Sequence, residues 1–227
     1  MTTYVALLGH PVSHSRSPRM HNAAFAAAGL DWHYSAFDTR DPLAAVAALR
    51  TLGFAGTNVT IPHKQAVVAA CDEADGESVN TLVFSGGRVR GYNTDREILA
   101  GIEASSACLI GAGGAALALM PALPAHTRTF SRRGEWPPRA EGCDLIVNAT
   151  PVTDVALVSP RPGQTVVDLA YRADGAETAL VAAARAAGCE VVDGLEALVR
   201  QGARSFELWT GRAPRLEIMR DAVGAGP

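Results

Sequence analysis

The sequence has few of the residues that build disulfide frameworks and metal centres. Among its 227 residues there are four cysteines, and no two of them form a CxxC pair. Cysteines scattered in this way are typical of separate reduced thiols in a cytosolic protein. The six histidines have no acidic or cysteine partner at the spacing of metal ligands. We therefore expect neither a disulfide nor a metal site.

Long apolar runs and surplus positive charge are also missing. No apolar run reaches the roughly 20 residues that cross a bilayer, and residues 1–15 lack the basic region and long apolar stretch of a signal peptide. The formal net charge is −3, whereas nucleic acids and anionic membranes favour a basic surface. We expect a cytoplasmic protein that binds neither nucleic acid nor membranes.

What the chain does contain is an alternation of strand-like and helix-like segments. Apolar runs predict strands at 4–9, 32–37, 54–61, 127–130, 144–150, 165–171 and 190–194, and two short strands within 79–95. Helical spacing predicts helices at 17–30, 41–53, 62–75 and 177–189, and two more after 194. Residues 107–120 combine a strand, a glycine turn and a helix. This alternation predicts an α/β fold with largely parallel strands.

Three candidate functional side chains coincide with expected helix starts. Ser17 precedes Pro18 and suits the N-cap position of the first helix. Lys64 lies in the first turn of the helix expected over 62–75, and Asp95 could cap a helix over 96–104. Capping and ligand binding are compatible roles for Ser17 and Asp95.

Residues 111–116, GAGGAA, fit the dinucleotide fingerprint G-x-G-x-x-A between an apolar run and a helical segment. Gly111 permits the tight turn, Gly113 lets the backbone approach a pyrophosphate, and Ala116 lets the helix pack closely on the strand. We predict a nucleotide site that includes Gly111, Ala112, Gly113, Gly114 and Ala115.

The end of the next strand predicts which nucleotide is bound. An NAD enzyme usually carries an acidic residue about 20 residues after the first glycine, bonded to the ribose. Here Arg132 lies 21 residues after Gly111, and Arg133 comes next. A guanidinium at this place can pair with a 2′-phosphate and stack on adenine. We predict NADP, bound by Ser131, Arg132 and Arg133, while the nearby Glu135 leaves NAD open.

Polar side chains gather at strand ends and helix starts in the first half of the chain, at 13–18, 58–64, 79–81 and 93–95. Such ends form the binding crevice of an open α/β sheet. Serine hydroxyls at a helix start suit a carboxylate, and Asn, Thr and Asp side chains suit a ring with several hydroxyls. Lys64, with Asp95 within reach, could relay a proton.

Eight motifs occur along the chain in a fixed order. They are GHPVSHSRSPRMHNAAF, GTNVTIPHK, VNT, GYNTD, GAGGAA, NATP, DLAY with Thr178 downstream, and GLEALVRQGARSFELWTG. This order resembles that of the shikimate dehydrogenase family, from Gly9 to about Gly211. The resemblance implies a reversible, NADPH-dependent reduction of the 3-keto group of 3-dehydroshikimate to shikimate.

The resemblance also implies roles for single residues. Lys64 would protonate the carbonyl oxygen that hydride transfer charges, and Asp95 would orient the ammonium group and the substrate hydroxyl. The substrate site would comprise Ser15 and Ser17 for the carboxylate, Asn58, Thr60, Asn80 and Gln201 for hydroxyls, and Tyr171, which closes the site. The cofactor site would also include Asn148, Ala149, Thr150 and Gly194.

The chain departs from the family pattern chiefly by being short. Only fifteen residues, 96–110, separate Asp95 from the glycine turn, and the compressed segment 132–144 leaves little room for a crossover helix. Arg96 stands where Gly is usual, and Ala197 stands where a Met commonly approaches the nicotinamide. We therefore expect a normal substrate pocket beside a reduced nucleotide-binding half.

These observations predict two α/β domains. A substrate-binding and catalytic domain would comprise 1–102 with 195–227, and a Rossmann-like NADP-binding domain would comprise 103–194. Two alternatives stay open: a quinate/shikimate or aminoshikimate dehydrogenase of a secondary pathway, or a non-catalytic binding protein with a degraded cofactor site. We expect a monomer or homodimer whose partner is the small-molecule substrate, shikimate or 3-dehydroshikimate, in chorismate and aromatic amino-acid biosynthesis.

Overall fold

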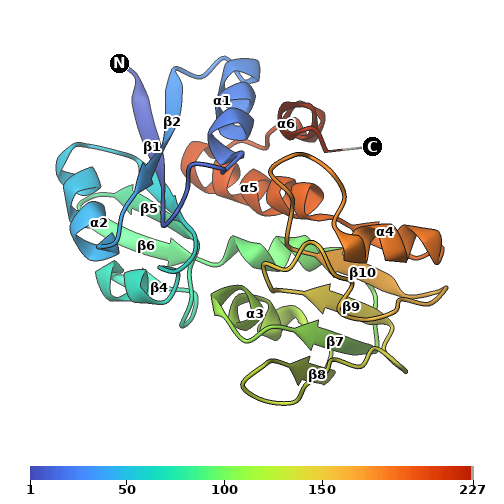
Figure 1. Ribbon diagram of the computed structural model, residues 1–227. Helices are drawn as coiled ribbons and strands as arrows, with labels where there is room; N and C mark the ends of the chain where they lie inside the picture. Colours follow the sequence, from blue (N-terminus) through green and yellow to red (C-terminus); the bar gives the residue numbers. More distant parts are fainter. Residues whose placement is uncertain (226–227) are drawn as a thin grey trace. The chain divides into compact units, whose positions relative to one another are not determined.

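The computed structural model describes residues 1–225, which form two compact units (Figure 1). The first unit contains Met1–Glu97 and the chain from Val199 onward, and the second contains Ile98–Leu198. Each unit has its own β-sheet with helices packed on it. The predicted two-domain α/β class is therefore confirmed.

The first unit is built on a six-stranded mixed sheet with the order β2-β1-β3-β5-β6-β4. Its strands are β1 (Thr3–Gly9), β2 (Trp32–Asp38), β3 (Gly56–Val59), β4 (Glu73–Ala74), β5 (Thr81–Ser85) and β6 (Arg88–Tyr92). Strands β2, β1 and β3 are parallel, whereas β5 is antiparallel to both β3 and β6. The ends of β3 and β6 and the start of β5 consequently lie at one edge of the sheet.

Helices cover both faces of this sheet. They are α1 (Ser17–Ala27), α2 (Pro42–Thr51), α6 (Leu216–Val223) and the part of α5 (Gly194–Thr210) that follows Leu198. Helix α1 packs on β2 and on α6 (Figure 1), and α2 packs on β1 and β3. Asp41 caps α2 by accepting a hydrogen bond from the backbone N–H of Ala44, as its sequence pattern indicates.

Two expected helices are replaced by short 3₁₀ turns. Within residues 62–75 the only helical element is η1 (Ala66–Ala70), because the chain then extends into β4. Asp72, just before β4, accepts a hydrogen bond from the N–H of Val89. The helix expected over 96–104 is η2 (Thr94–Leu99), and the left-handed Gly101 follows it. Asp95 therefore lies inside a 3₁₀ turn and caps no α-helix.

The cap predicted for α1 is also wrong. Helix α1 begins at Ser17 itself, and Arg16 occupies the N-cap position without a capping side chain. The N–H of Ser17 instead donates to Oγ of Ser15 at 3.3 Å. One serine of the SRS sequence thus supports the backbone of the other.

The second unit is a five-stranded, fully parallel sheet with the order β11-β10-β9-β7-β8. Its elements are β7 (Ser106–Ile110), α3 (Gly114–Leu119), η3 (Met120–Ala122), β8 (His126–Phe130), β9 (Leu145–Asn148), β10 (Thr165–Asp168), α4 (Ala179–Ala186) and β11 (Glu190–Val192). Residues 131–144 contain neither helix nor strand, which confirms the predicted loss of a crossover helix.

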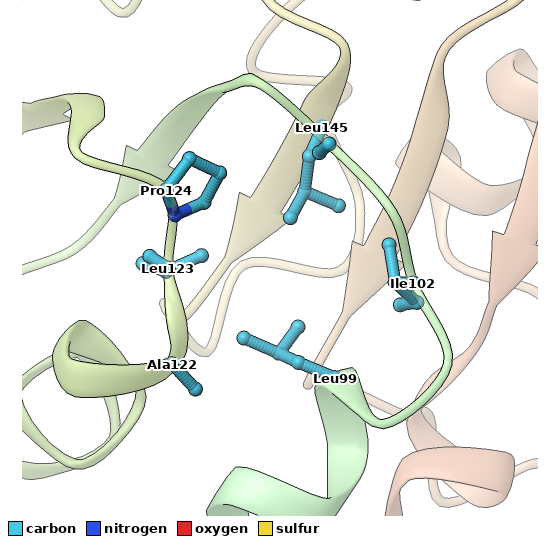
Figure 2. A pocket seen from close by; sticks show the side chains of 7 residues that line it. Leu99, Ile102, Ala122, Leu123, Pro124 and Leu145 are labelled. Carbon is cyan, nitrogen blue, oxygen red and sulfur yellow. The ribbon is translucent and has the colours of Figure 1, made fainter.

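A cavity of about 190 Å³ lies in the second unit. Figure 2 shows side chains of Leu99, Leu123 and Leu145 around this space. The full lining is Leu99, Ile102, Ala104, Ala122, Leu123, Pro124 and Leu145. Leu145 is the first residue of β9, so the cavity lies at the end of the parallel sheet where the strands begin. The glycine turn follows β7 and lies at the opposite end of the sheet.

Candidate active site

Lys64 and Asp95 form a nearly buried ion pair in the first unit. The Lys64 Nζ atom lies 2.6 Å from Oδ2 of Asp95, and the two side chains are 12% and 7% exposed. Lys64 is the only lysine in the sequence, in which every other Lys or Arg residue is arginine. An arginine in this place could not release a proton, because its pKa exceeds about 12.

Sheet topology brings this pair together. Lys64 follows β3, Asp95 follows β6, and Asn80 immediately precedes β5, which lies between those two strands. The carbonyl of Lys64 accepts a backbone hydrogen bond from Val79, which ties the lysine segment to the start of β5. Both ionic side chains therefore come from the same sheet edge, although 31 positions separate them in sequence.

Asn80 connects the ion pair to its surroundings. Its Nδ2 donates to Oδ1 of Asp95 at 2.7 Å and to Oε1 of Gln201 at 3.4 Å. Its Oδ1 accepts from the N–H and the hydroxyl of Thr94, at 2.9 and 3.0 Å. Since Lys64 binds the other oxygen of Asp95, both oxygens of that carboxylate are held in place.

Asn58 lies deeper, in a buried network of hydroxyl groups. Its Oδ1 accepts from the hydroxyl of Tyr34 at 2.8 Å, and its Nδ2 lies 2.9 Å from Oγ1 of Thr81 and 3.0 Å from Oγ of Ser205. Sequence reasoning missed Tyr34 and Ser205 as parts of the site, whereas Thr81 lies in the predicted polar segment 79–81. Ser205 could have been found, because it stands four residues after Gln201 and therefore shares its helix face.

Ser17 joins the same network through Tyr34, with which its side chain forms a hydrogen bond. Burial raises the pKa of the Tyr34 phenol, and the bond from Ser17 acts in the opposite direction. Ser15 lies one residue before Arg16 at the start of α1. Thr60 follows β3, and any side chain at Gly9 would collide with its methyl group. These residues lie in the first unit, as do Lys64 and Asp95.

The predicted nucleotide residues all lie in the second unit. Gly111 follows β7 with a φ of +123°, and an added side chain there would come within 2.9 Å of the carbonyl oxygen of Ala149. A side chain built at Gly113 would meet no atom within 4 Å, so the backbone before α3 borders open space. A cradle of this form fits the diphosphate of a dinucleotide.

The arginines lie in a tight turn directly after β8. The N–H of Gly134 donates to the carbonyl of Ser131, and the N–H of Ser131 donates to the carbonyl of Glu135, at 3.0 and 3.1 Å. Within this turn the guanidinium of Arg132 lies 5.9 Å from the ring centre of Trp136, a distance compatible with a cation–π contact. Arg133 is exposed beside it.

The segment Asn148–Thr150 extends beyond β9. Asn148 Oδ1 accepts from the N–H and the hydroxyl of Thr150, at 3.1 and 2.7 Å. The Ala149 N–H donates to the carbonyl of Ile110, which fixes this segment against the glycine turn. Asn148 therefore supports the backbone that carries Thr150.

Tyr171 follows β10, and Gly194 begins α5. A side chain at Gly194 would collide with the carbonyl of Ala170, so close packing is one reason for glycine there. Ala197 is buried in the core of the second unit. The structure assigns Tyr171, Gly194 and Ala197 to the second unit and the ion pair to the first.

Residues 1–225 contain neither a candidate membrane-spanning helix nor a candidate metal-binding cluster. No helix in this range is long and apolar enough to cross a membrane. No three His, Cys, Asp or Glu side chains in the same range are gathered so that they could hold a metal ion.

Comparison with known proteins identifies the family. The model of the "Shikimate dehydrogenase substrate binding domain" matches residues 7–82, and that of the "Shikimate 5'-dehydrogenase C-terminal domain" matches residues 194–223. The shikimate dehydrogenase (NADP(+)) of Moorella thermoacetica is 39% identical, over 99% of this chain and 95% of the relative. The chain belongs to the shikimate dehydrogenase family. The predicted resemblance is thereby confirmed.

Solved structures of the family share the fold. The shikimate 5-dehydrogenase of Thermus thermophilus, in complex with NADP(H) and shikimate, superposes with a TM-score of 0.84 at 33% identity, over 98% of this chain and 99% of that one. A quinate dehydrogenase of Corynebacterium glutamicum, in complex with NAD, gives 0.81 at 28% identity, over 99% of each chain.

This member of the shikimate dehydrogenase family is short. The alignment with the Moorella thermoacetica relative extends over 281 positions, whereas this chain has 227 residues. At least 54 of those positions are therefore gaps in this chain. In the second unit, α3 has only six residues and the segment 131–144 contains no helix.

Proposed function

We propose that this chain is an NADP-dependent oxidoreductase that interconverts 3-dehydroshikimate and shikimate. The observation that supports this most directly is the nearly buried Lys64–Asp95 pair, held at one sheet edge with Asn80 and Gln201 around it. Family membership supplies the reaction type, and the ion pair supplies the acid that the reaction needs.

Lys64 is the proposed general acid. Bound NADPH would supply the hydride for the carbonyl carbon of the substrate, which would leave negative charge on the carbonyl oxygen. The ammonium of Lys64 donates a proton to that oxygen, and in the reverse direction the neutral amine removes it. Proton transfer from a positioned group of this kind contributes about 10²–10⁴-fold to the rate.

Asp95 is the proposed orienting partner. Asn80 holds one of its oxygens and Lys64 the other, so the carboxylate fixes where the ammonium points. Asp95 can also accept a hydrogen bond from the substrate hydroxyl. Asn80 and Gln201, with Asn58 and Thr60, are the side chains assigned to the remaining substrate hydroxyls.

Ser15 and Ser17 are the proposed carboxylate ligands. They stand at the start of the eleven-residue helix α1, where the helix dipole favours an anion. Tyr34 bonds to Ser17 and to Asn58, so it links the carboxylate end of the site to its hydroxyl end. Tyr171 remains assigned to the substrate by family resemblance.

The second unit is the proposed NADP-binding domain, and the first unit the substrate-binding and catalytic domain. The glycine turn 111–115 would hold the diphosphate. Arg132 and Arg133, with Ser131, would hold the 2′-phosphate, because a guanidinium binds phosphate oxygens in pairs. Asn148, Ala149, Thr150 and Gly194 would complete the site. We also propose a cytoplasmic enzyme that is a monomer or homodimer, which sedimentation equilibrium would test.

The direct test is NADP reduction on addition of shikimate, followed by the absorbance of NADPH. We expect the wild-type protein to turn over and the Lys64→Ala variant to lose about 10²–10⁴-fold in kcat. Arg50→Ala, an exposed change on α2, serves as the control and should keep wild-type rates. A folded wild-type protein as inactive as Lys64→Ala would refute the proposal.

A second candidate substrate is quinate or an amino analogue of shikimate. The similarity to a quinate dehydrogenase structure favours quinate as the competitor to test. Values of kcat/KM for shikimate, quinate and aminoshikimate, measured side by side with NADP and NAD, decide between the three substrates. We expect shikimate with NADP to give the highest value.

A further inference from the structure

A buried carboxylate of the second unit has no part in the chemistry described so far. Asp168 is the last residue of β10, and it is 0% exposed. Burial raises the pKa of its carboxyl group, and hydrogen bonds from Thr178, Ala170 and Asn148 act against that rise. A buried acid of this kind is costly to the fold unless its hydrogen bonds are complete.

Three donors from three different segments converge on this carboxylate. Oδ1 accepts from Nδ2 of Asn148 at 2.9 Å and from the N–H of Ala170 at 3.0 Å. Oδ2 accepts from the hydroxyl of Thr178 at 2.5 Å. Since all three partners donate, the site requires an acceptor on both oxygens, which the ionised acid provides.

Each donor belongs to a segment that the fold must hold at the edge where the parallel strands end. The side-chain oxygen of Asn148 accepts two hydrogen bonds from Thr150 and so holds that residue in place. Ala170 immediately precedes Tyr171. Thr178 caps α4 by accepting from the N–H of Val181. The segment 148–150 is thus tied to Asp168 through a side chain, and the segment 170–171 through its backbone.

We infer that Asp168 is a positioning residue that sets the cofactor-side segment 148–150 and the substrate-side segment 170–171 at the same time. Asp168 is fully buried and acts through Asn148 and Ala170. The inference rests on the proposed function for the ligand-binding roles of Thr150 and Tyr171. Loss of the carboxylate is therefore expected to weaken NADPH binding and to raise the KM for shikimate together.

The same sheet offers a matched control. Asp144 lies just before β9, at the end of the sheet where the strands begin, and its Oδ2 also accepts several hydrogen bonds, from the N–H and hydroxyl groups of Ser105 and Ser106. Asp168→Asn and Asp144→Asn make the same chemical change. They differ in which end of the sheet loses its acceptor and in burial, because Asp144 is exposed whereas Asp168 is fully buried.

Two readouts test the inference. The first is NADPH affinity by fluorescence titration, for which we expect Asp168→Asn to raise Kd about tenfold and Asp144→Asn to raise it less than about twofold. The second is amide hydrogen exchange without ligand, in which Asp168→Asn should accelerate exchange at Thr150 and Ala170, and Asp144→Asn at Ser105 and Ser106.

A double-mutant cycle separates positioning from general support of the fold. In a Thr150→Val background, Asp168→Asn should weaken NADPH binding by less than about twofold, because the contact it positions is already lost. Additive effects in this cycle, or equal NADPH losses in the Asp168 and Asp144 variants, would overturn the inference.

A second variant and a measurement without ligand keep the test decisive. If Asp168→Asn does not fold, Thr178→Val removes the donor to Oδ2 and leaves Asp168 in place. This variant should raise the Kd for NADPH less than the tenfold expected for Asp168→Asn, and an unchanged Kd with unchanged exchange at Ala170 would count against the inference. The wild-type titration and turnover report on the proposed function, whereas ligand-free amide exchange reports on Asp168 alone.

Discussion

The candidate sites of the two units are formed by different parts of the chain, side chains in one and backbone in the other. Twelve of the sixteen buried polar or charged side chains among residues 1–225 lie in the first unit, around Lys64, Asp95 and Asn58. The second unit has a glycine turn, an exposed arginine turn and a buried hydrogen-bond network around Asp168. The first site is made by side chains, and the second is made largely by backbone.

This difference predicts that the chain tolerates shortening better in the second unit than in the first. A site made by interlocking side chains loses several partners when one strand or turn is removed. A backbone cradle depends only on the strand, the turn and the first residues of the helix, so peripheral helices can be lost. The six-residue α3, the helix-free segment 131–144 and the cavity beside Leu99 all lie in the second unit.

The largest expected effect comes from replacing the ammonium group of Lys64, in the first unit, with a guanidinium group. Lys64→Arg keeps a positive charge beside Asp95, but a guanidinium does not release its proton at any working pH. We expect kcat to fall about 10²–10⁴-fold, as in Lys64→Ala. Steady-state kinetics with shikimate and NADP measure this. Retention of more than about a tenth of the activity would mean that charge, and not proton transfer, is what the site needs.

In the second unit, removal of one arginine should change cofactor choice. Arg132→Ala loses charged hydrogen bonds to the 2′-phosphate, so we expect the Kd for NADPH to rise roughly 10- to 100-fold while the Kd for NADH changes little. Arg139→Ala, an exposed arginine of the same helix-free segment, is the control. Equal losses for both cofactors would place Arg132 outside the 2′-phosphate site.

Acid should destabilise the first unit through His21. This imidazole is fully buried, and its two ring nitrogens have no hydrogen-bond partner. Burial lowers its pKa from 6.5 to about 3. Between pH 6.5 and about 3, the imidazole is therefore protonated in the unfolded chain and neutral in the folded chain. The free energy of unfolding consequently falls as the pH drops through this range, by at most about 1.4 kcal/mol per pH unit.

The variant His21→Phe isolates this contribution, because a phenyl ring can join Phe25, Tyr34 and Trp209, which surround the imidazole. Urea denaturation at several pH values should give a shallower acid dependence for the variant than for wild type. Parallel curves would show that His21 does not control acid stability.

The smallest expected effect comes from the cavity in Figure 2. Ala122→Leu adds apolar atoms to its lining, and cavity filling commonly raises the free energy of unfolding by about 0.5–2 kcal/mol. Ala125→Leu adds the same group outside the lining and should not stabilise the chain. Enzyme activity should be unchanged in both variants, since the cavity lies at the opposite end of the sheet from the glycine turn.

Sequence patterns predicted the strands and the local turns well, because these follow from alternation and from glycine. The turn at 111–116 and the Asp41 cap are examples. The helices expected over 62–75 and 96–104 are short 3₁₀ turns, because pairing of β4 with β6 and the left-handed Gly101 outweigh helical spacing. Tertiary pairing of this kind leaves no local signal in the sequence.

The residues of the candidate site also fall into two groups, those that the sequence predicted and those that it did not. Lys64, Asp95, Asn80 and Gln201 were predicted, and the structure joins them by hydrogen bonds. Tyr34 and Ser205 were not, because their part in the site depends on distant segments meeting in the interior. Asp168 lies inside a predicted motif, yet its three donors come from segments up to 20 positions away.

The single lysine has a practical consequence. Any reagent that selects side-chain amines can label this protein at one side chain only, within the proposed site. Reductive methylation with a carbon-13 reagent would thus give one side-chain resonance, whose chemical shift against pH would follow the protonation of Lys64 itself, with and without shikimate. The molecule carries its own spectroscopic reporter at the atom on which the proposed chemistry depends.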